Sequence, residues 1–145
     1  MMQFQNGPSR AFTYVLVTTD GQFTIRQDTF QGVRDQIRAG HQGSQEIIDL
    51  PNLDPVMAYC SIAYEQSDPR RMNKVANGMV WELTARPDRE QIDDPYAHEP
   101  LRVVKMRGPV AFMVRGDRSL DEDDITGLRE AHETAYGKLR ARGWI

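Results

Sequence analysis

The chain has 145 residues, of which 27% are charged, and a formal net charge of -3. This length is typical of one domain, so we expect residues 1–145 to form a single unit around one core. The balanced charge argues against non-specific nucleic-acid binding, which requires a surplus of basic residues. The single cysteine, Cys60, excludes an internal disulfide and favours a reducing compartment.

The N-terminal residues carry neither a basic region nor an apolar run, so we do not expect them to be a signal peptide. We expect residues 1–10 to be a flexible N-terminus. No stretch approaches the ~18 consecutive apolar residues of a membrane span. These features predict a cytoplasmic protein without a membrane partner.

Residues 11–19 are nearly all apolar or β-branched, and residues 22–27 alternate strictly between apolar and polar side chains. Asp20-Gly21 lies between them, and this dipeptide suits the type I′ turn of a hairpin. The sequence therefore predicts two strands joined by a tight turn.

A helix is expected next, with Asp28 as its N-cap and Gln31 completing a capping box. Gly40 stands where a helix-ending glycine belongs. The helix would bury an apolar stripe made of Phe30, Val33 and Ile37.

Two strands are expected after this helix. Residues 45–50 form a short one that Pro51 ends, and residues 56–65 are apolar on both faces. A strand that is apolar on both faces is typical of the middle of a covered sheet.

The second helix is expected to begin at Asp68, with Pro69 in the first helical position. Its apolar side chains follow helical spacing: Met72, Val75, Ala76, Met79, Val80 and Leu83. Gly78 weakens the later turns, so residues 79–84 fit either the end of this helix or a separate strand.

Residues 85–100 hold three prolines and few apolar side chains, which predicts a loop or insertion. Residues 101–106 and 109–115 are strand-like and flank Gly108-Pro109. They are either two strands or one long strand with a bulge, because proline cannot donate to a ladder.

The last helix has the clearest start. Asp121 can cap it with Asp124 three residues later, and Leu120 can pack on Ile125 across the first turn. The expected buried stripe is Ile125, Leu128, His132, Ala135 and Leu139. Whether this stripe, together with Tyr136 and Trp144, forms core or the interface of a homo-oligomer stays open.

The resulting order is β-β-α-β-β-α-β-α. It predicts an α+β fold, in which a mostly antiparallel sheet carries about three helices packed mainly on one face.

The sequence contains no phosphate-binding glycine loop of the common nucleotide-binding types. The acidic run at Asp121–Asp124 is explained by the helix dipole, and the acidic residues around His98 lack metal-ligand spacing. Cys60 is expected to be a small buried apolar residue, and His132 a hydrogen-bonded core or interface residue. We therefore expect a protein that is not an enzyme and holds neither metal nor cofactor.

One polar cluster is not explained in this way. Arg70, Arg71 and Lys74 fall in the first turns of the expected second helix, where cations oppose the helix dipole. A polar stripe opposite the apolar one holds Arg70, Asn73, Lys74 and Asn77. A helix N-terminus with several cations suits a phosphate or carboxylate ligand. The pattern is open between a solvated face and such a binding site.

Several short motifs also resemble a known family. They are the hairpin start YVLVTTDGQFTIRQ, the helix start Asn73-Lys74-Val75-Ala76, the apolar run that opens with Gly108-Pro109, and the segment Ser119–Ile125. Together they resemble the domain family of unknown function numbered 3846, common in phages, plasmids and bacterial mobile elements. The resemblance covers residues 12–128 and implies a mobile-element context, without supplying catalytic residues.

These observations lead to a non-enzymatic accessory protein of phage or mobile-element type that binds a host protein or a small ligand. The alternative is a nucleotide-binding or other anion-binding module that uses the basic start of the second helix. Its candidate ligand-binding residues are Arg70, Arg71, Asn73, Lys74 and Asn77.

Overall fold

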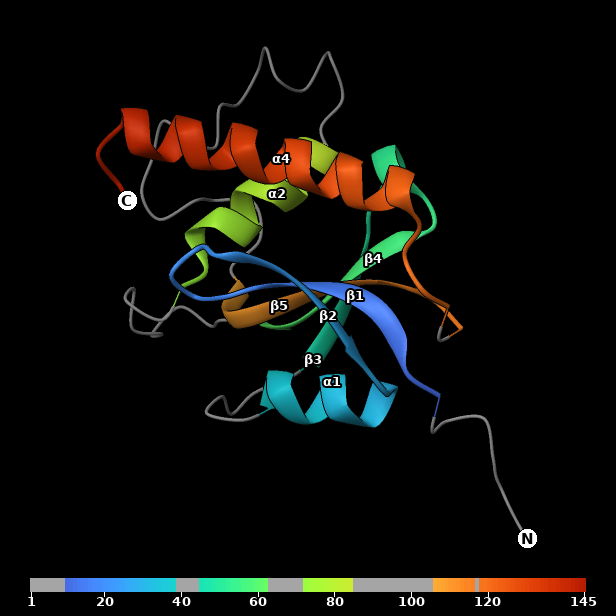
Figure 1. The fold of residues 1–145 in the computed structure, drawn as a ribbon. Helices are drawn as coiled ribbons and strands as arrows, with labels where there is room; N and C mark the ends of the chain where they lie inside the picture. The colour runs from blue at the N-terminus through green and yellow to red at the C-terminus, as the bar shows by residue number, and fades with distance from the viewer. Residues whose placement is uncertain (1–9, 39–44, 63–71, 85–105, 117) are drawn as a thin grey trace, which may run out of the picture.

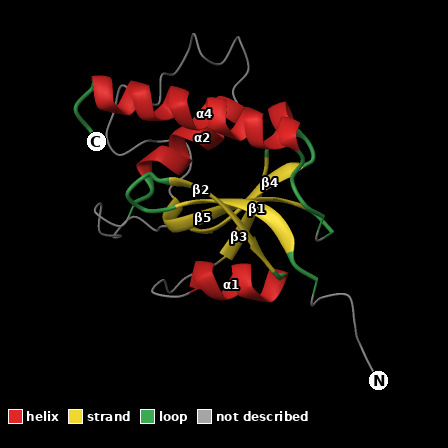
Figure 2. Cartoon of the chain, in the orientation of Figure 1, coloured by secondary structure: helices red, strands yellow, loops and turns green. Residues whose placement is uncertain are grey.

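The computed structural model describes residues 10–38, 45–62, 72–84, 106–116 and 118–145. These residues form a five-stranded antiparallel sheet with helices on both faces (Figures 1 and 2), which confirms the expected α+β class. In chain order the elements are β1 (Phe12–Val17), β2 (Phe23–Asp28), α1 (Phe30–Arg38), β3 (Gln45–Asp49), a 3-10 turn (Pro51–Leu53), β4 (Val56–Ile62), α2 (Lys74–Thr84), β5 (Met106–Val114) and α4 (Glu122–Ala141).

The strands lie in the order β2-β1-β5-β4-β3. The first two strands pair with each other, as do β3 and β4, and β5 lies between β1 and β4. β4 is buried along almost its whole length, as its apolar character on both faces predicts. β2 and β3 are the edge strands.

Helices α2 and α4 cover one face of the sheet, and α1 lies alone on the opposite face (Figure 1). Val15, Ala58 and Phe112 point towards α2 and α4, whereas Tyr14 and Met57 point towards α1. The helices are therefore mainly on one face, as expected, but each face of the sheet has its own apolar core.

The hairpin between β1 and β2 is confirmed, but its turn differs from the expected type. Gly21 N–H donates to Thr18 O over 2.8 Å, and Thr18 N–H donates to Gln22 O over 3.0 Å. Gly21 has φ +90° and is the last residue of the loop between Thr18 and Gln22, not one of two central residues of a type I′ turn. This is a three-residue loop, in which one glycine with positive φ matches the twist of the strands.

The first helix begins one residue later than expected. Asp28 ends β2, and Thr29 caps α1 by accepting a hydrogen bond from Gly32 N–H at 3.1 Å. Asp28 instead accepts from the Thr29 backbone at 2.7 Å. The apolar stripe is confirmed, since Val33 and Ile37 are fully buried.

The described part of the strand pattern around Gly108-Pro109 is one strand, and residues 101–105 lie outside the described residues. β5 runs from Met106 to Val114 through both residues, and the register against β4 shifts between Tyr59 and Ser61. Gly108 has φ +71°, which glycine adopts without strain. The irregularity accommodates Pro109 in the middle of the sheet.

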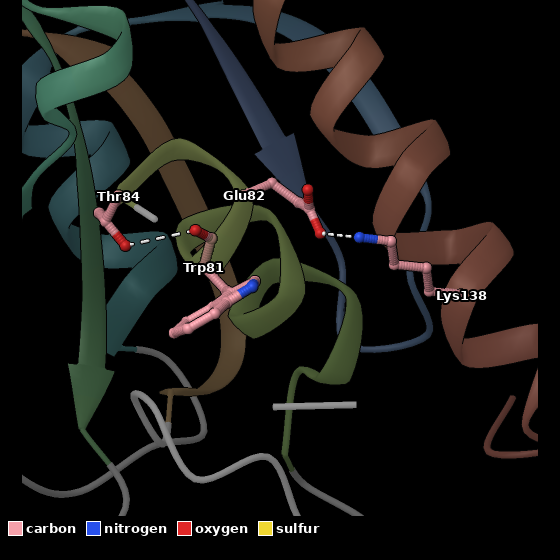
Figure 3. Close-up of polar contacts among 4 residues, drawn as sticks. All are labelled: Trp81, Glu82, Thr84 and Lys138. Carbon is pink, nitrogen blue, oxygen red and sulfur yellow. Dashed lines mark hydrogen bonds and ion pairs between the residues drawn. The ribbon is translucent and has the colours of Figure 1, made fainter. Parts of the chain in front are cut away.

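The start of α4 is as expected. Asp121 accepts from Asp124 N–H, and the Asp124 side chain accepts from Asp121 N–H, which forms the complete capping box. Further along, Lys138 of α4 donates to Glu82 of α2 at 2.9 Å (Figure 3). This contact links the two helices that share one face of the sheet.

The second helix differs most from its prediction. α2 begins at Lys74, because Met72 pairs with Arg107 of β5 and Asn73 is the residue before the helix. Residues 79–84 continue the helix and do not form a strand. Thr84 in its last turn donates to Val80 O at 2.7 Å and to Trp81 O (Figure 3).

Several predictions fall outside the described residues: the N-terminus up to residue 9, the proposed cap Asp68 with Pro69, and the expected loop over residues 85–100. Within the described ranges, none of the helices is long and apolar enough to cross a membrane.

Candidate functional site

Asn73 fixes the start of α2 to the sheet. Its side-chain amide donates to Val17 O at 3.0 Å and to Gly108 O at 2.8 Å. Its side-chain oxygen accepts from Ala76 N–H at 3.0 Å, which is the N-cap bond of the helix. Asn73 is completely buried, so one side chain caps α2 and joins it to β1 and β5.

Asn77, one turn later, extends this network. Its amide donates to Asn73 O at 2.7 Å and to Met106 O at 3.2 Å, and its oxygen accepts from Met106 N–H at 3.2 Å. Asn77 is also buried. The two asparagines satisfy backbone groups of β1, β5 and α2 that would otherwise be buried without partners.

This geometry corrects the expected polar stripe. Asn73 and Asn77 face the sheet and not solvent, and their amides already have protein partners. Arg70 and Arg71 lie outside the described residues. Of the five candidate ligand-binding residues, Lys74 is the one that the structure places at a pocket.

The pocket has a volume of about 300 Å³, at the lower end of the range for small-molecule sites. Three separate parts of the chain line it: the β1–β2 turn, the start of α2 and the segment that follows α4. The lining residues are Thr19, Asp20, Met72, Lys74, Val75, Trp144 and Ile145.

The pocket combines two opposite charges with an apolar wall. The Lys74 ammonium donates to Trp144 O at 3.1 Å, so the lysine head lies next to the segment after α4. Asp20 stands on the β1–β2 turn, where its carboxylate accepts from the Thr18 hydroxyl. Met72, Val75 and Trp144 supply apolar surface. The arrangement suits a small ligand with an acidic group and an apolar body.

Close packing holds the β1–β2 turn against α2. Gly21 is buried, and a Cβ atom at this position would lie 2.8 Å from Val75 Cγ2. His132 of α4 donates from Nε2 to Gly21 O at 2.7 Å, since a carbonyl oxygen can only accept. The prediction of a hydrogen-bonded histidine is confirmed, and its partner is the turn that carries Asp20.

An aromatic group surrounds this histidine. Phe23 and Tyr136 lie 5.4 and 5.8 Å from the His132 ring, and the Arg129 guanidinium lies 4.9 Å from the Phe23 ring. Tyr136 is 37% exposed. The β1–β2 turn therefore contacts both the pocket and a partly exposed aromatic group.

Cys60 has the environment that its apolar neighbours predict. It is buried in the core beneath α2, and burial raises the pKa of its thiol to about 12, with a further increase from the Glu46 carboxylate. At neutral pH it is therefore a protonated thiol with little nucleophilic character. Among the described residues, no group of three or more His, Cys, Asp or Glu side chains could hold a metal ion.

No protein-family model, curated protein or solved structure matches the chain. The resemblance to the family numbered 3846 therefore stays a prediction that rests on the sequence motifs.

Sequence reasoning found Lys74 but missed the other walls of the pocket. Thr19 was assigned to the first strand and Asp20 to the turn that follows it, and Trp144 was left open between the core and a subunit interface. A turn and a distant C-terminal segment meet at α2 because of the strand order and the Gly21–Val75 contact. No local pattern in the sequence carries that information.

Proposed function

We propose that the chain is a non-enzymatic binding protein, and that the pocket at the start of α2 holds a small ligand with an acidic group. The observation that carries the proposal is the Lys74 ammonium, held in a pocket of about 300 Å³ whose other residues include Val75 and Trp144. A phage or mobile-element origin and a cytoplasmic location belong to the proposal. They are supported by the sequence motifs and by the single cysteine.

The pocket favours a ligand with two features. Lys74 would pair with a carboxylate or phosphate oxygen, since an ammonium acts as a compact charge with three donors. Asp20 would accept from a hydroxyl or amino group elsewhere on the same molecule. A nucleotide has this combination, together with a flat apolar base to lie against Trp144.

The experiment is a fluorescence titration with nucleoside mono- and diphosphates in the Trp81→Phe variant. Trp81 is buried, so its removal leaves Trp144 at the pocket as the single reporter. We expect a saturable change in Trp144 emission as nucleotide is added. Adding Lys74→Gln should weaken the affinity for the nucleotide at least 10-fold. Arg118→Gln removes the same charge from an exposed position and serves as the matched control.

A saturable change that is equally strong with Lys74→Gln would contradict the role of the lysine. The absence of any change with all of these anions would contradict the pocket as an anion site. The melting temperature of each variant is measured as well, to check that a loss of binding is not caused by unfolding.

A second candidate function is binding of a host protein through the edge of the sheet next to this turn. Ile25 on edge strand β2 is 49% exposed. On the same strand, Phe23 has the Arg129 guanidinium of α4 4.9 Å from its ring, and Tyr136 of α4 stacks on His132. Tyrosine and arginine are enriched among residues that dominate protein interfaces. A host protein retained by the wild type and by Lys74→Gln, but lost with Ile25→Glu, would favour this function over ligand binding.

A further inference from the structure

Strand β2 has one side on which it meets no other described strand. It lies at the end of the strand order, with β1 as its neighbour. In the hairpin, Thr18 N–H donates to Gln22 O at 3.0 Å, which sets the alternation of hydrogen-bonded pairs along the two strands. Every second residue of β2 therefore turns its backbone N–H and C=O groups away from β1: Phe23, Ile25 and Gln27.

The outer side of β2 lacks the devices that usually protect a sheet edge. Proline, lysine or a bulge on an edge strand prevents another strand from pairing with it. β2 contains neither proline nor lysine, and its register against β1 is unbroken. At its centre stands Ile25, whose side chain is 49% exposed. An apolar residue in the middle of an open edge is typical of a strand that accepts a further strand.

β2 is complementary to a second copy of itself in the antiparallel direction. When Ile25 stands opposite Ile25 of the second copy, Phe23 stands opposite Gln27, and all the outward residues form hydrogen-bonded pairs. Thr24 then stands opposite Arg26. If the centre of pairing moved by one residue to Arg26, two arginines would stand directly opposite each other, which is destabilising. The strand therefore favours self-pairing centred on Ile25.

The other edge strand, β3, is less suited to pair with its own copy. Its central residue Ile47 is 44% exposed, much like Ile25. However, β3 carries the carboxylates of Glu46 and Asp49 and no basic residue. Two copies of β3 would therefore gather carboxylates without a cation in either strand, whereas β2 carries one basic and one acidic side chain.

Helix α4 extends the same surface, because it lies on the face of the sheet to which Phe23 and Ile25 belong (Figure 1). The Arg129 guanidinium lies 4.9 Å from the Phe23 ring, at the start of β2. Glu122 and Asp123 stand in the first turn of α4, about two turns before Arg129.

A twofold axis through the paired strands would place the two copies of α4 antiparallel on one face. Arg129 of each copy would then lie towards the acidic first turn of the other copy. Because opposite charges across an interface favour one partner and one orientation, the charges of α4 complement a second copy of the same helix.

From these observations we propose that two copies of this chain pair through β2. The two five-stranded sheets become one continuous sheet, and both α4 helices lie on the same face of it. The backbone pairing supplies hydrogen bonds, and the α4 helices add side-chain area to the interface. The proposal goes beyond the pocket and does not depend on its ligand. It assigns this edge of the sheet to a second copy in place of a host protein.

The test is sedimentation equilibrium of the purified full chain. We expect a dimer with twice the 16.6 kDa mass of the chain and a Kd of about 10 µM or lower. Ile25→Glu places two carboxylates opposite each other and should weaken the dimer about 100-fold. Ile47→Glu makes the same change on the other edge strand and should dimerise as the wild type. Melting temperatures check that both variants are folded.

Disulfide formation tests the register. Residues of a hydrogen-bonded pair have Cα atoms about 5.5 Å apart, which is within the range for a disulfide. With oxidised glutathione, Ile25→Cys should therefore form a covalent dimer, and Ile47→Cys should not. The native Cys60 is buried and adds little background.

Three results would overturn the proposal: a chain that stays monomeric at about 100 µM, equal weakening by Ile25→Glu and Ile47→Glu, or a covalent dimer of Ile47→Cys without one of Ile25→Cys. The purified chain separates self-pairing from host-protein binding, since no host protein is present. A monomeric chain that captures a host protein through Ile25 would assign the edge to that host protein.

Discussion

The two helices that share a face of the sheet begin in different ways. α4 is capped by its own sequence, through the exposed, reciprocal bonds between Asp121 and Asp124. α2 is capped by buried Asn73, whose amide also binds carbonyl groups of β1 and β5. The start of α4 is therefore a local structure, whereas the start of α2 exists only when the sheet is assembled.

The candidate pocket lies at the start of α2, which depends on the assembled sheet. Lys74 and Val75 immediately follow Asn73, so their positions depend on the contact between α2 and the sheet. A pocket built on such a contact is pre-organised, which reduces the ordering cost of binding.

The largest effect is expected for Asn73→Ala. It removes the cap and leaves the carbonyl groups of Val17 and Gly108 buried without this donor, which should lower the free energy of unfolding by about 3 kcal/mol. Urea denaturation followed by far-UV circular dichroism measures the change. A loss below ~1 kcal/mol would mean that the sheet contacts add little to the cap.

Cys60 gives a second readout of the same variant, because it lies in the core beneath α2. Labelling of its thiol by iodoacetamide requires opening of that core, so we expect it to be about 100-fold faster in Asn73→Ala. Unchanged labelling would show that α2 stays on the sheet without Asn73.

Asn77→Ala should have the second largest effect, about 2 kcal/mol, since it removes three hydrogen bonds but leaves the cap in place. Chemical denaturation measures this loss, and Asn77→Asp tests the amide at nearly constant shape. If Asn77→Asp were as stable as the wild type, loss of donation to Met106 O would not explain the destabilisation of Asn77→Ala.

Asp121→Ala should cost about 1 kcal/mol, the usual value for an exposed N-cap. Asp121→Ser retains a capping oxygen and should recover most of the loss. Iodoacetamide labelling of Cys60 should rise only about 5-fold in Asp121→Ala. A loss as large as that of Asn73→Ala would remove the distinction between the two helix starts.

The smallest effect concerns pH at the start of α4. Burial raises the pKa of Asp124; a backbone hydrogen bond from Asp121 opposes the shift, and the neighbouring acidic charges add to it. The folded state therefore holds this proton more tightly than the unfolded chain does. Its contribution to stability is present at low pH and is lost as pH rises from the unfolded value of 3.8 through the folded value.

Asp124→Asn removes this titration. As pH rises from about 3 to 6, the wild type loses this contribution and the variant does not. The unfolding free energy of the variant should therefore rise relative to that of the wild type, which denaturation at several pH values measures. A difference that is constant over this interval would show that Asp124 titrates alike in both states.

The same contrast explains which parts of the fold the sequence predicts. The order of elements follows from apolar periodicity, and the start of α4 follows from a capping pattern four residues long. The start of α2 was misplaced because Asp68-Pro69 is also a good local helix start, whereas the bonds that hold Asn73 in the sheet come from Val17 and Gly108, which lie far away in the chain. Helical spacing also cannot distinguish a polar side chain in solvent from one that binds strand carbonyls, and this led to the wrong placement of Asn77.

The walls of the candidate pocket differ in the same respect. Lys74 was identified because it lies in a basic cluster within a single segment. Thr19 and Trp144 belong to segments that are separate in the sequence, and only the fold brings them to the start of α2. Walls assembled from such distant segments leave no local signal in the sequence.

The position of β5 has a consequence for synthesis of the chain. The strand that joins the β1–β2 and β3–β4 hairpins is supplied by residues 106–114, so Val15 pairs with Phe112. Isolated two-stranded hairpins are only marginally stable in water. During synthesis the two hairpins therefore leave the ribosome before β5 is made. Until then their inner strands, β1 and β4, are unpaired on one side. In this interval the nascent chain is most prone to aggregation and to chaperone binding.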